Sequence, residues 1–296
     1  MRIAVLTSPE SWYFRDLARA AAARHELTPI PFSRIASALY AGPGFSAESK
    51  GVRLDEFDAV LVRTMPPGSL EQVVFRMDVL GELERRGVPV INPPRALETA
   101  VDKYLASARL QAAGLPTPRT WVCQTAEEAM AGFAALGSDV VLKPLFGGEG
   151  RGITRLNDES LALRAFKMLA QLGAVLYLQE FIPHAGCDLR LMVLGERVLG
   201  MRRRNAGDWR TNMSRGAVGE PWDRDEELVA MARRAAAAVS APWAGVDLLP
   251  ARDGSLYVLE VNAVPGWKGL AQTLNLDVAA MALEFVESLV RGGRER

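Results

Sequence analysis

Two acidic residues and an amide residue lie close together in apolar surroundings near the C-terminal end of the chain. Glu260 and Asn262 are two positions apart in VLEVN, so on a strand their side chains share one face. Asp247 lies in GVDLL, one predicted hairpin strand earlier, where an unpaired carboxylate is costly. Such oxygens suit Mg²⁺, which also bridges to nucleotide phosphates. We therefore predict a magnesium site; alternatively, Asp247 caps a turn and Glu260 pairs with an arginine.

A lysine and a glycine-rich loop follow an apolar run in DVVLKPLFGGEGRGI. Lys143 precedes the glycines, whereas a Walker loop places its lysine after them, and GGEGRG does not match GxGxxG. A flexible glycine loop can nevertheless close over phosphates through its backbone N–H groups. The sequence leaves two interpretations open, a lid over a nucleotide and a mobile surface hairpin with an exposed lysine.

A third group is basic and lies between these two. Its members are Asp188, Arg190, Arg202, Arg203, Arg204, Arg210 and Asn212. If Asp188 and Arg190 share a strand face with the basic end of the next strand, they form an anion pocket opposite the magnesium ligands. Arg203 lies between Arg202 and Arg204 on the predicted strand, so its side chain faces away from theirs. The alternatives are a solvated basic edge or a nucleic-acid patch.

Composition narrows the function classes. The 35 basic and 35 acidic residues give a formal net charge of +0, and aromatic residues are not interleaved with the arginines, so nucleic acid is not expected as a partner. Two cysteines and two histidines argue against a disulfide framework and against a zinc site. No apolar run is long enough to span a bilayer, and no signal peptide precedes the first strand. We expect a cytoplasmic protein without a membrane partner.

The elements that position these residues fall into two patterns. Up to about residue 95, apolar strands at 2–7, 58–66 and 88–92 alternate with helices at 12–24 and 69–87, which predicts a doubly wound α/β domain. Ser69 opens the second helix with a capping-box pattern.

The rest of the chain mixes helices with antiparallel hairpins, an α+β pattern. We expect one helix over 96–114, an extended link over 115–123 and a helix capped by Thr125. Antiparallel strand pairs are expected to turn at 195–196 and at Asp253-Gly254. The predicted domains are 1–95, 96–175 and 176–296.

Eight short motifs occur in an order that resembles the ATP-grasp ligases. They are Asp-Lys at 102–103, Lys-Pro at 143–144, the glycine loop, Gln-Glu-Phe-Ile at 179–182, Asp-x-Arg at 188–190, Gly-Asp-Trp-Arg-x-Asn at 207–212, Gly-Val-Asp at 245–247, and Glu-Val-Asn followed by Pro-Gly from 260. Within that superfamily the pattern is similar to the RimK-type amino-acid ligases, chiefly α-L-glutamate ligases. The resemblance covers nearly the whole chain and implies an ATP-grasp fold behind a leading α/β domain.

The resemblance implies roles for the matching residues. ATP would contact Lys103, Lys143, Gly147, Gly148, Glu149, Gly150, Arg151, Gly152, Gln179, Glu180, Phe181, Ile182, Asp188, Arg210 and Asn212. Magnesium, with manganese as an alternative, would bind Asp247, Glu260 and Asn262. Arg203 and Arg190, with Arg210, would stabilise the reacting groups. ATP phosphorylates a carboxylate in such ligases, and an amine then attacks the acyl phosphate.

Departures from the family pattern bear on the acceptor. The glycine loop carries charges at 149 and 151, and Ala-Val-Pro-Gly-Trp-Lys follows Glu-Val-Asn. We expect Gly266 and Trp267 beside the acceptor, and Arg63 and Arg76 on a substrate carboxylate. These segments look like a branch that adds glutamate to small cofactor-like acceptors of the tetrahydromethanopterin type.

Other functions remain alternatives: modification of a protein C-terminus, an inactive nucleotide-binding regulatory module, or RNA binding. A homo-oligomer is possible.

Overall fold

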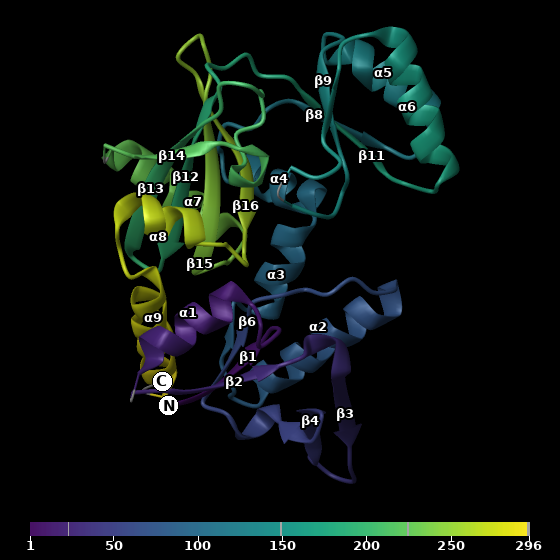
Figure 1. Cartoon of the computed structure of the whole chain (residues 1–296). Coiled ribbons are helices and arrows are strands. Elements are labelled where there is room, and N and C mark those ends of the chain that lie inside the picture. The colour runs from purple at the N-terminus through teal and green to yellow at the C-terminus, as the bar shows by residue number, and fades with distance from the viewer. Residues whose placement is uncertain (23, 149, 224, 295–296) are drawn as a thin grey trace.

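The computed structural model describes residues 1–22, 24–148, 150–223 and 225–294, arranged as three sheet-based units (Figure 1). The first unit is a parallel sheet in the order β2-β1-β6-β7, as the alternation of strands and helices predicted. Its strands are β1 (Arg2–Leu6), β2 (Glu26–Ile30), β6 (Ala59–Val62) and β7 (Val90–Ile91), and its helices are α1 (Trp12–Ala21) and α2 (Leu70–Arg85).

Capping of α2 follows the prediction. The Ser69 hydroxyl accepts from the Gln72 N–H, and the Gln72 side chain accepts from the Ser69 N–H. This pair satisfies two donors that a helix start otherwise leaves unpaired.

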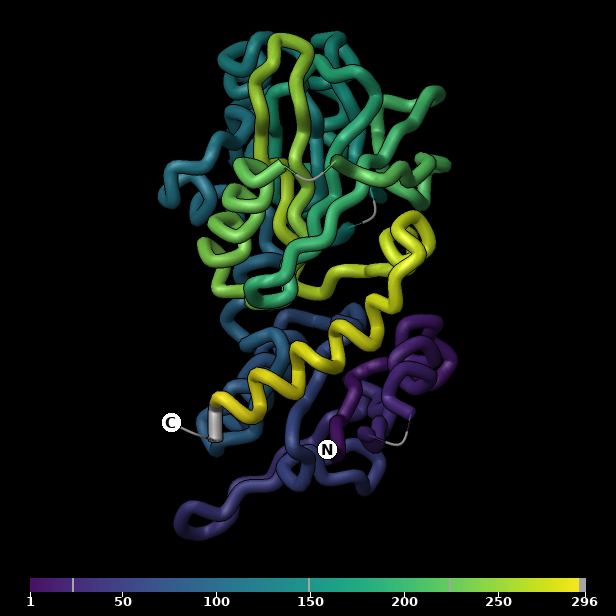
Figure 2. The backbone as a smooth tube through the Cα atoms, turned by 90° about the vertical axis from the view of Figure 1, so that its left-hand side faces the viewer, coloured from purple at the N-terminus to yellow at the C-terminus, as the bar shows by residue number. Residues whose placement is uncertain are grey.

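A small antiparallel sheet inside the first unit was not predicted. It consists of β3 (Ile35–Leu39), β4 (Phe45–Ser49) and β5 (Val52–Arg53), flanked by the short helices η1 (Phe32–Arg34) and η2 (Leu54–Glu56). The β3–β4 hairpin projects from the first unit (Figure 2). Alanine and serine dominate its strands, so the alternation of apolar and polar residues that announces a strand is weak here.

The single helix expected over 96–114 is two helices, α3 (Pro94–Val101) and α4 (Lys103–Ala112). Asp102 breaks the run with extended backbone angles, and its carboxylate accepts from the N–H groups of Tyr104 and Leu105 at 2.9 and 3.1 Å. Aspartate is a favoured N-cap because it satisfies these unpaired donors. The break places Lys103 at the start of a helix rather than within one.

The second unit is an antiparallel sheet in the order β10-β9-β11-β8, packed against α5 (Ala126–Ala135) and α6 (Glu159–Gln171) (Figure 1). The strands are β8 (Thr120–Cys123), β9 (Val140–Lys143), β10 (Thr154–Leu156) and β11 (Leu176–Glu180). Thr125 caps α5 as predicted. Because β11 pairs with both β8 and β9, this sheet extends past the boundary expected at 175.

The third unit is a five-stranded antiparallel sheet in the order β14-β13-β12-β15-β16. Its strands are β12 (Cys187–Leu194), β13 (Arg197–Arg204), β14 (Val218–Pro221), β15 (Trp243–Pro250) and β16 (Leu256–Asn262), with η3 (Met213–Arg215) before β14. Both predicted hairpins are confirmed. The apolar side chains of one sheet face pack against α7 (Glu226–Ala238), which leaves the opposite face for the polar residues.

The C-terminal helices join the first and third units. After α8 (Lys268–Leu274), α9 (Val278–Arg294) runs back and packs against α1 (Figure 2). One buried cluster contains Ile3 and Val5 of β1 together with Trp267 and Val286. Asn92 adds hydrogen bonds from the end of β7 to the Trp243 and Ala263 backbone. The two units therefore have a common core, which fixes the residues between them. In the described ranges no helix is both long and apolar enough to cross a membrane.

Candidate active site

The polar face of the five-stranded sheet brings the predicted acidic and basic residues together. Cross-strand register pairs Asp188 with Arg203, Arg190 with Asp247, and Asp247 with Glu260. Paired residues on neighbouring strands lie on the same face. A row of charged residues therefore crosses four strands, β13, β12, β15 and β16, and ends in two neighbouring acidic residues, Asp247 and Glu260.

An irregularity in β16 sets the position of Glu260. The register shifts between Asp247 and Leu248, so that Leu248 pairs with Val258 although Asp247 pairs with Glu260. Leu259 is the extra residue of this β-bulge, and Val258 remains in the core. Bulges commonly re-aim a side chain next to active sites. Here Leu259 and Glu260 both line the cleft between the second and third units.

Four charged side chains form a buried network on this face. Asp247 accepts from Arg190 Nη1 at 2.6 Å and pairs with Arg203 Nη2 at 3.0 Å. Arg203 also donates two hydrogen bonds to Asp188, which accepts a further one from the Thr211 hydroxyl at 2.6 Å. Burial raises the pKa of Asp247, but the two arginines outweigh it and hold that pKa below its usual value. Asp247 is therefore an anion.

The donor set near Asp247 fits magnesium. Glu260 makes no hydrogen bond or ion pair with other residues of the described ranges, so both of its oxygens are available. Asn262 adds an amide oxygen, which also accepts from the Val264 N–H at 2.8 Å. Among the described residues no cluster of three or more His, Cys, Asp or Glu side chains could hold a metal alone. Mg²⁺ usually takes one or two carboxylates and completes its shell with water and phosphates, and Asp247, Glu260 and Asn262 are donors of this kind.

Lys143 lies at the end of β9, partly buried and facing this acidic group. Its Nζ donates to Gln179 Oε1, and the Gln179 amide in turn donates to the Thr120 hydroxyl at 3.2 Å. Burial lowers the pKa of Lys143 to about 8, although Glu260 opposes the shift. The Gln179 side chain thus orients the lysine.

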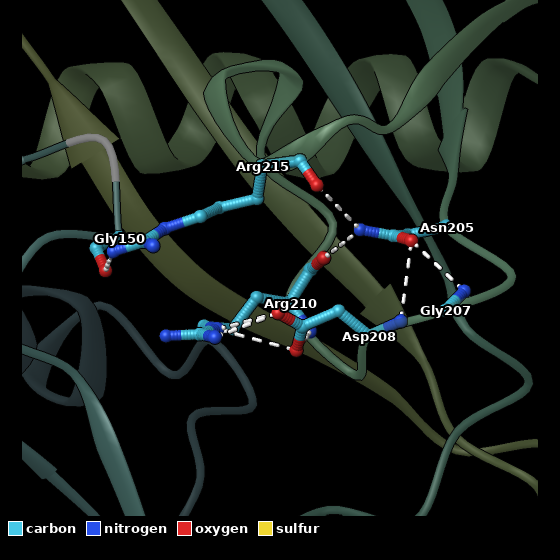
Figure 3. Close-up of polar contacts among 6 residues, drawn as sticks. All are labelled: Gly150, Asn205, Gly207, Asp208, Arg210 and Arg215. Carbon is cyan, nitrogen blue, oxygen red and sulfur yellow. Dashed lines mark hydrogen bonds and ion pairs between the residues drawn. The ribbon is translucent and has the colours of Figure 1, made fainter.

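Lys103, the first residue of α4, lines a further cavity together with Gly147, Gly148 and Glu260. Its Nζ donates to the Gly147 carbonyl at 2.6 Å, and burial lowers its pKa. Gly150 lies against Asn212 on the other side, because a Cβ added at 150 would be 2.5 Å from Asn212 Oδ1. Gly150 also accepts from Arg215 at 3.3 Å (Figure 3). Glu149, a predicted lid residue, lies outside the described residues.

Aromatic side chains surround residues 179–182, which the family resemblance implies as ATP contacts. Glu180 is turned away by Arg119, whose N–H and Nε donate to its carboxylate at 2.7 and 2.6 Å. The Arg155 guanidinium carbon lies 3.5 Å from the centroid of the Phe181 ring, and Trp209 meets that ring edge-on at 5.7 Å. Together with buried Ile182 these rings give an apolar slot for a planar base.

The loop after β13 carries Arg210 to the cleft, and Asn205 folds it (Figure 3). The Asn205 amide donates to the Arg210 and Arg215 carbonyls at 2.9 and 3.2 Å, and its Oδ1 accepts from the N–H groups of Gly207 and Asp208. Asp208 accepts from Arg210 Nη2 at 2.7 Å. Asn205 and Asp208, neither of them predicted, therefore set the direction of the Arg210 guanidinium.

A second cavity opens between the first and third units. It contains Tyr13 and Arg63 from the first unit and Gly266 and Lys268 from the segment after β16. Tyr13 was not predicted, because no local sequence pattern marks a residue that reaches a cavity only through the packing of two domains.

Four residues line both this cavity and the cleft between the second and third units: Arg203, Asn212, Asp247 and Glu260.

The predicted substrate residues separate in the structure. Arg63 and Gly266 line the second cavity. Trp267 has no exposed surface; its indole donates to Asp16 and its ring packs against the Arg63 guanidinium, so it supports Arg63 instead of reaching a ligand. Arg76 is buried beneath the segment before α2, where it donates to the Pro66 carbonyl at 2.7 Å.

Comparison with known proteins agrees with this geometry. The family model described as a RimK-like ATP-grasp domain matches residues 100–286. The tetrahydromethanopterin:alpha-L-glutamate ligase of Methanosarcina acetivorans is 33% identical over 96% of this chain and 98% of its own length. Among solved structures, the RimK domain protein of Sphaerobacter thermophilus has a TM-score of 0.74 at 26% identity, covering 96% of this chain and 99% of its own. The ATP-grasp ligase PsnB, complexed with a minimal precursor, has a TM-score of 0.76 at 24% identity, covering 96% and 98%.

Proposed function

Because the chain belongs to the RimK-like ATP-grasp family, we propose that this ATP-grasp ligase adds L-glutamate to a small cofactor-like acceptor of the tetrahydromethanopterin type. One observation carries the proposal: the cleft between the second and third units and the second cavity meet at Arg203, Asn212, Asp247 and Glu260. A γ-phosphate in the first and a carboxylate in the second would touch there. The relative from Methanosarcina acetivorans supports the choice of glutamate and of the acceptor class.

The residues suit each part of the reaction. Phe181 and Ile182 would hold the base, and Lys103 and Lys143 would hold the phosphates beneath the 147–152 lid. Mg²⁺, or Mn²⁺ in its place, would be held by Asp247, Glu260 and Asn262, and it would neutralise phosphate charge.

The transfer itself needs no protein nucleophile. A substrate carboxylate oxygen attacks the γ-phosphorus and ADP leaves; the amine then attacks the acyl carbon and inorganic phosphate leaves. Arg203 and Arg190, fixed by Asp188 and Asp247, are placed to stabilise the tetrahedral oxyanion. Burial keeps water from the acyl phosphate, which would otherwise hydrolyse.

ADP release measured with purified protein, Mg²⁺, L-glutamate and a panel of pterin-type acceptors tests the proposal. We expect ADP only when both substrates are present, and a product heavier by one or more glutamyl residues. If the glutamyl mass increment is found on a protein instead, the acceptor is a protein C-terminus and not a small molecule. Absence of both ATP binding and ADP release would refute ligase activity.

Location and assembly are part of the proposal. Cys123 and Cys187 are free thiols, which agrees with a reducing cytoplasm. We propose a homo-oligomer as the assembly to test, by light scattering of the purified protein.

A further inference from the structure

Arg63 stands at the carboxyl end of β6, the edge of a parallel sheet where α/β folds place ligands. Its backbone N–H donates to the Leu6 carbonyl at 3.1 Å, which continues the pairing with β1 and fixes the residue. The side chain is 6% exposed and is directed at the junction between the first and third units.

The guanidinium of Arg63 is buried without an acidic partner in the described part of the chain. One nitrogen, Nη2, donates to the Pro265 carbonyl at 2.6 Å, while the buried Nε has no hydrogen-bond partner. The rings of Trp267, Trp243 and Tyr13 surround the cation with centroids at 4.7, 4.8 and 5.6 Å. Burial lowers the pKa of Arg63 to about 10, so the group is still a cation at neutral pH.

Aromatic rings attract a cation but do not neutralise it. A buried charge is usually paired with an opposite charge, and the other two buried arginines near this site follow the rule. Arg190 pairs with Asp247, and Arg203 pairs with Asp188 and Asp247. Arg63 therefore has the unsatisfied donor and the uncompensated charge that a bound anion would complete.

Two cavities beside Arg63 have space for an anion. Arg63 lines the second cavity, and it lines a further cavity that contains Thr64, Met65 and Lys103. Both cavities also contain Glu260 and Asn262, whereas the residues around the nucleotide cleft do not include Arg63. An anion at Arg63 in the second cavity is thus beside the reacting centre, and this cavity does not include Lys103, Lys143 or the glycine loop, which are proposed to hold the ATP phosphates.

We propose that Arg63 binds a substrate carboxylate that does not react. In the proposed reaction the carboxylate to be phosphorylated lies at the four residues common to the cleft and the second cavity, and we assign the Arg63 anion to a different group. A planar guanidinium matches a carboxylate, and this inference rests on the proposed function for its ligand. The source is either the incoming amino acid, through one of its carboxylates, or the acceptor.

Arg76 provides a matched control. It is also buried, at 4% exposure, it also donates to a proline carbonyl, and it also lies over an aromatic ring, that of Phe32. It is not among the residues of the two cavities that Arg63 lines. Arg63→Met and Arg76→Met therefore remove comparable structural contacts, and only the first removes the proposed carboxylate receptor.

Steady-state rates of ADP release, with ATP, L-glutamate and the acceptor each varied in turn, separate the possibilities. We expect Arg63→Met to raise the KM of one carboxylate substrate by about 10- to 100-fold, with the KM of ATP unchanged, because charge-assisted hydrogen bonds are lost. Arg63→Lys should recover only part of this loss, since ammonium lacks the planar fork. A raised KM for L-glutamate identifies the amino acid as the source, and a raised KM for the acceptor identifies the acceptor. Kinetic constants like those of Arg76→Met would overturn the proposal.

If glutamate supplies the carboxylate that binds Arg63, substrate analogues identify which of its two carboxylates it is. L-Glutamine lacks the side-chain carboxylate and L-isoglutamine lacks the α-carboxylate. Wild type should discriminate against one of them, and Arg63→Met should not. Equal discrimination by both proteins overturns the assignment to that substrate.

Ligand binding measured without turnover tests the Arg63 site independently of whether the protein has ligase activity. Thermal unfolding is followed with Mg²⁺, ADP and L-glutamate, and in parallel with the acceptor. One ligand should stabilise wild type and Arg76→Met but not Arg63→Met. Equal stabilisation of all three proteins by both ligands refutes the site, whereas ADP release tests the ligase. Arg63→Lys replaces Arg63→Met if the latter does not fold.

Discussion

Replacement of Asp247 by asparagine tests whether the buried charge network is balanced as the structure indicates. Asp247 is the acidic partner of Arg190 within the described residues, whereas Arg203 keeps its two hydrogen bonds to Asp188. The variant therefore leaves one cation unpaired, with its side chain only 13% exposed. Losing one partner of a buried ion pair costs about 3–5 kcal/mol, and asparagine can still accept one hydrogen bond. We expect a loss of about 3 kcal/mol in the free energy of unfolding, at the lower end of that range.

The assay is urea unfolding of four proteins: wild type, Asp247→Asn, Arg190→Met and the double variant. The double variant leaves Asp188 and Arg203 as a balanced pair, so its loss should be smaller than the sum of the single losses by about 1–3 kcal/mol. Asp253→Asn changes an exposed hairpin carboxylate and should leave the unfolding midpoint unchanged. Additive single losses, or an Asp247→Asn midpoint equal to that of wild type, would refute the reasoning.

Three further predictions concern binding and stability. Lys143 is charged only below its pKa of about 8, so the dissociation constant of ATP should be constant below pH 8 and rise above it, and Lys143→Met should abolish that dependence in calorimetric titrations. Asn92→Ala removes three hydrogen bonds between the first and third units and should lower the free energy of unfolding by about 3 kcal/mol; an unchanged urea midpoint contradicts this. Gly150→Ala should raise the KM of ATP more than Gly148→Ala does, because only the first new methyl group meets Asn212, and an equal effect of both excludes this contact.

Local rules predicted much of the fold. The parallel strands of the first unit, the caps at Ser69 and Thr125, and the turn at Asp253-Gly254 all follow from residues within a few positions of one another. The same holds for Lys143 at a strand end and for the common face of Glu260 and Asn262. Where the local signal was weak, as in the alanine- and serine-rich β3–β4 hairpin, prediction failed.

The sequence by itself determined which residues could bear charge and bind oxygen-rich ligands, because these properties depend on residue type and on spacing along one strand. Pairings between distant residues were decided by the tertiary structure. The bulge at Leu259 brings Glu260 beside Asp247, and Gln179 is used to hold Lys143. Arg63 lies among three aromatic rings only because the first and third units have a common core. Cross-strand register and domain packing depend on the free energy of the whole fold, so no short stretch of sequence contains them.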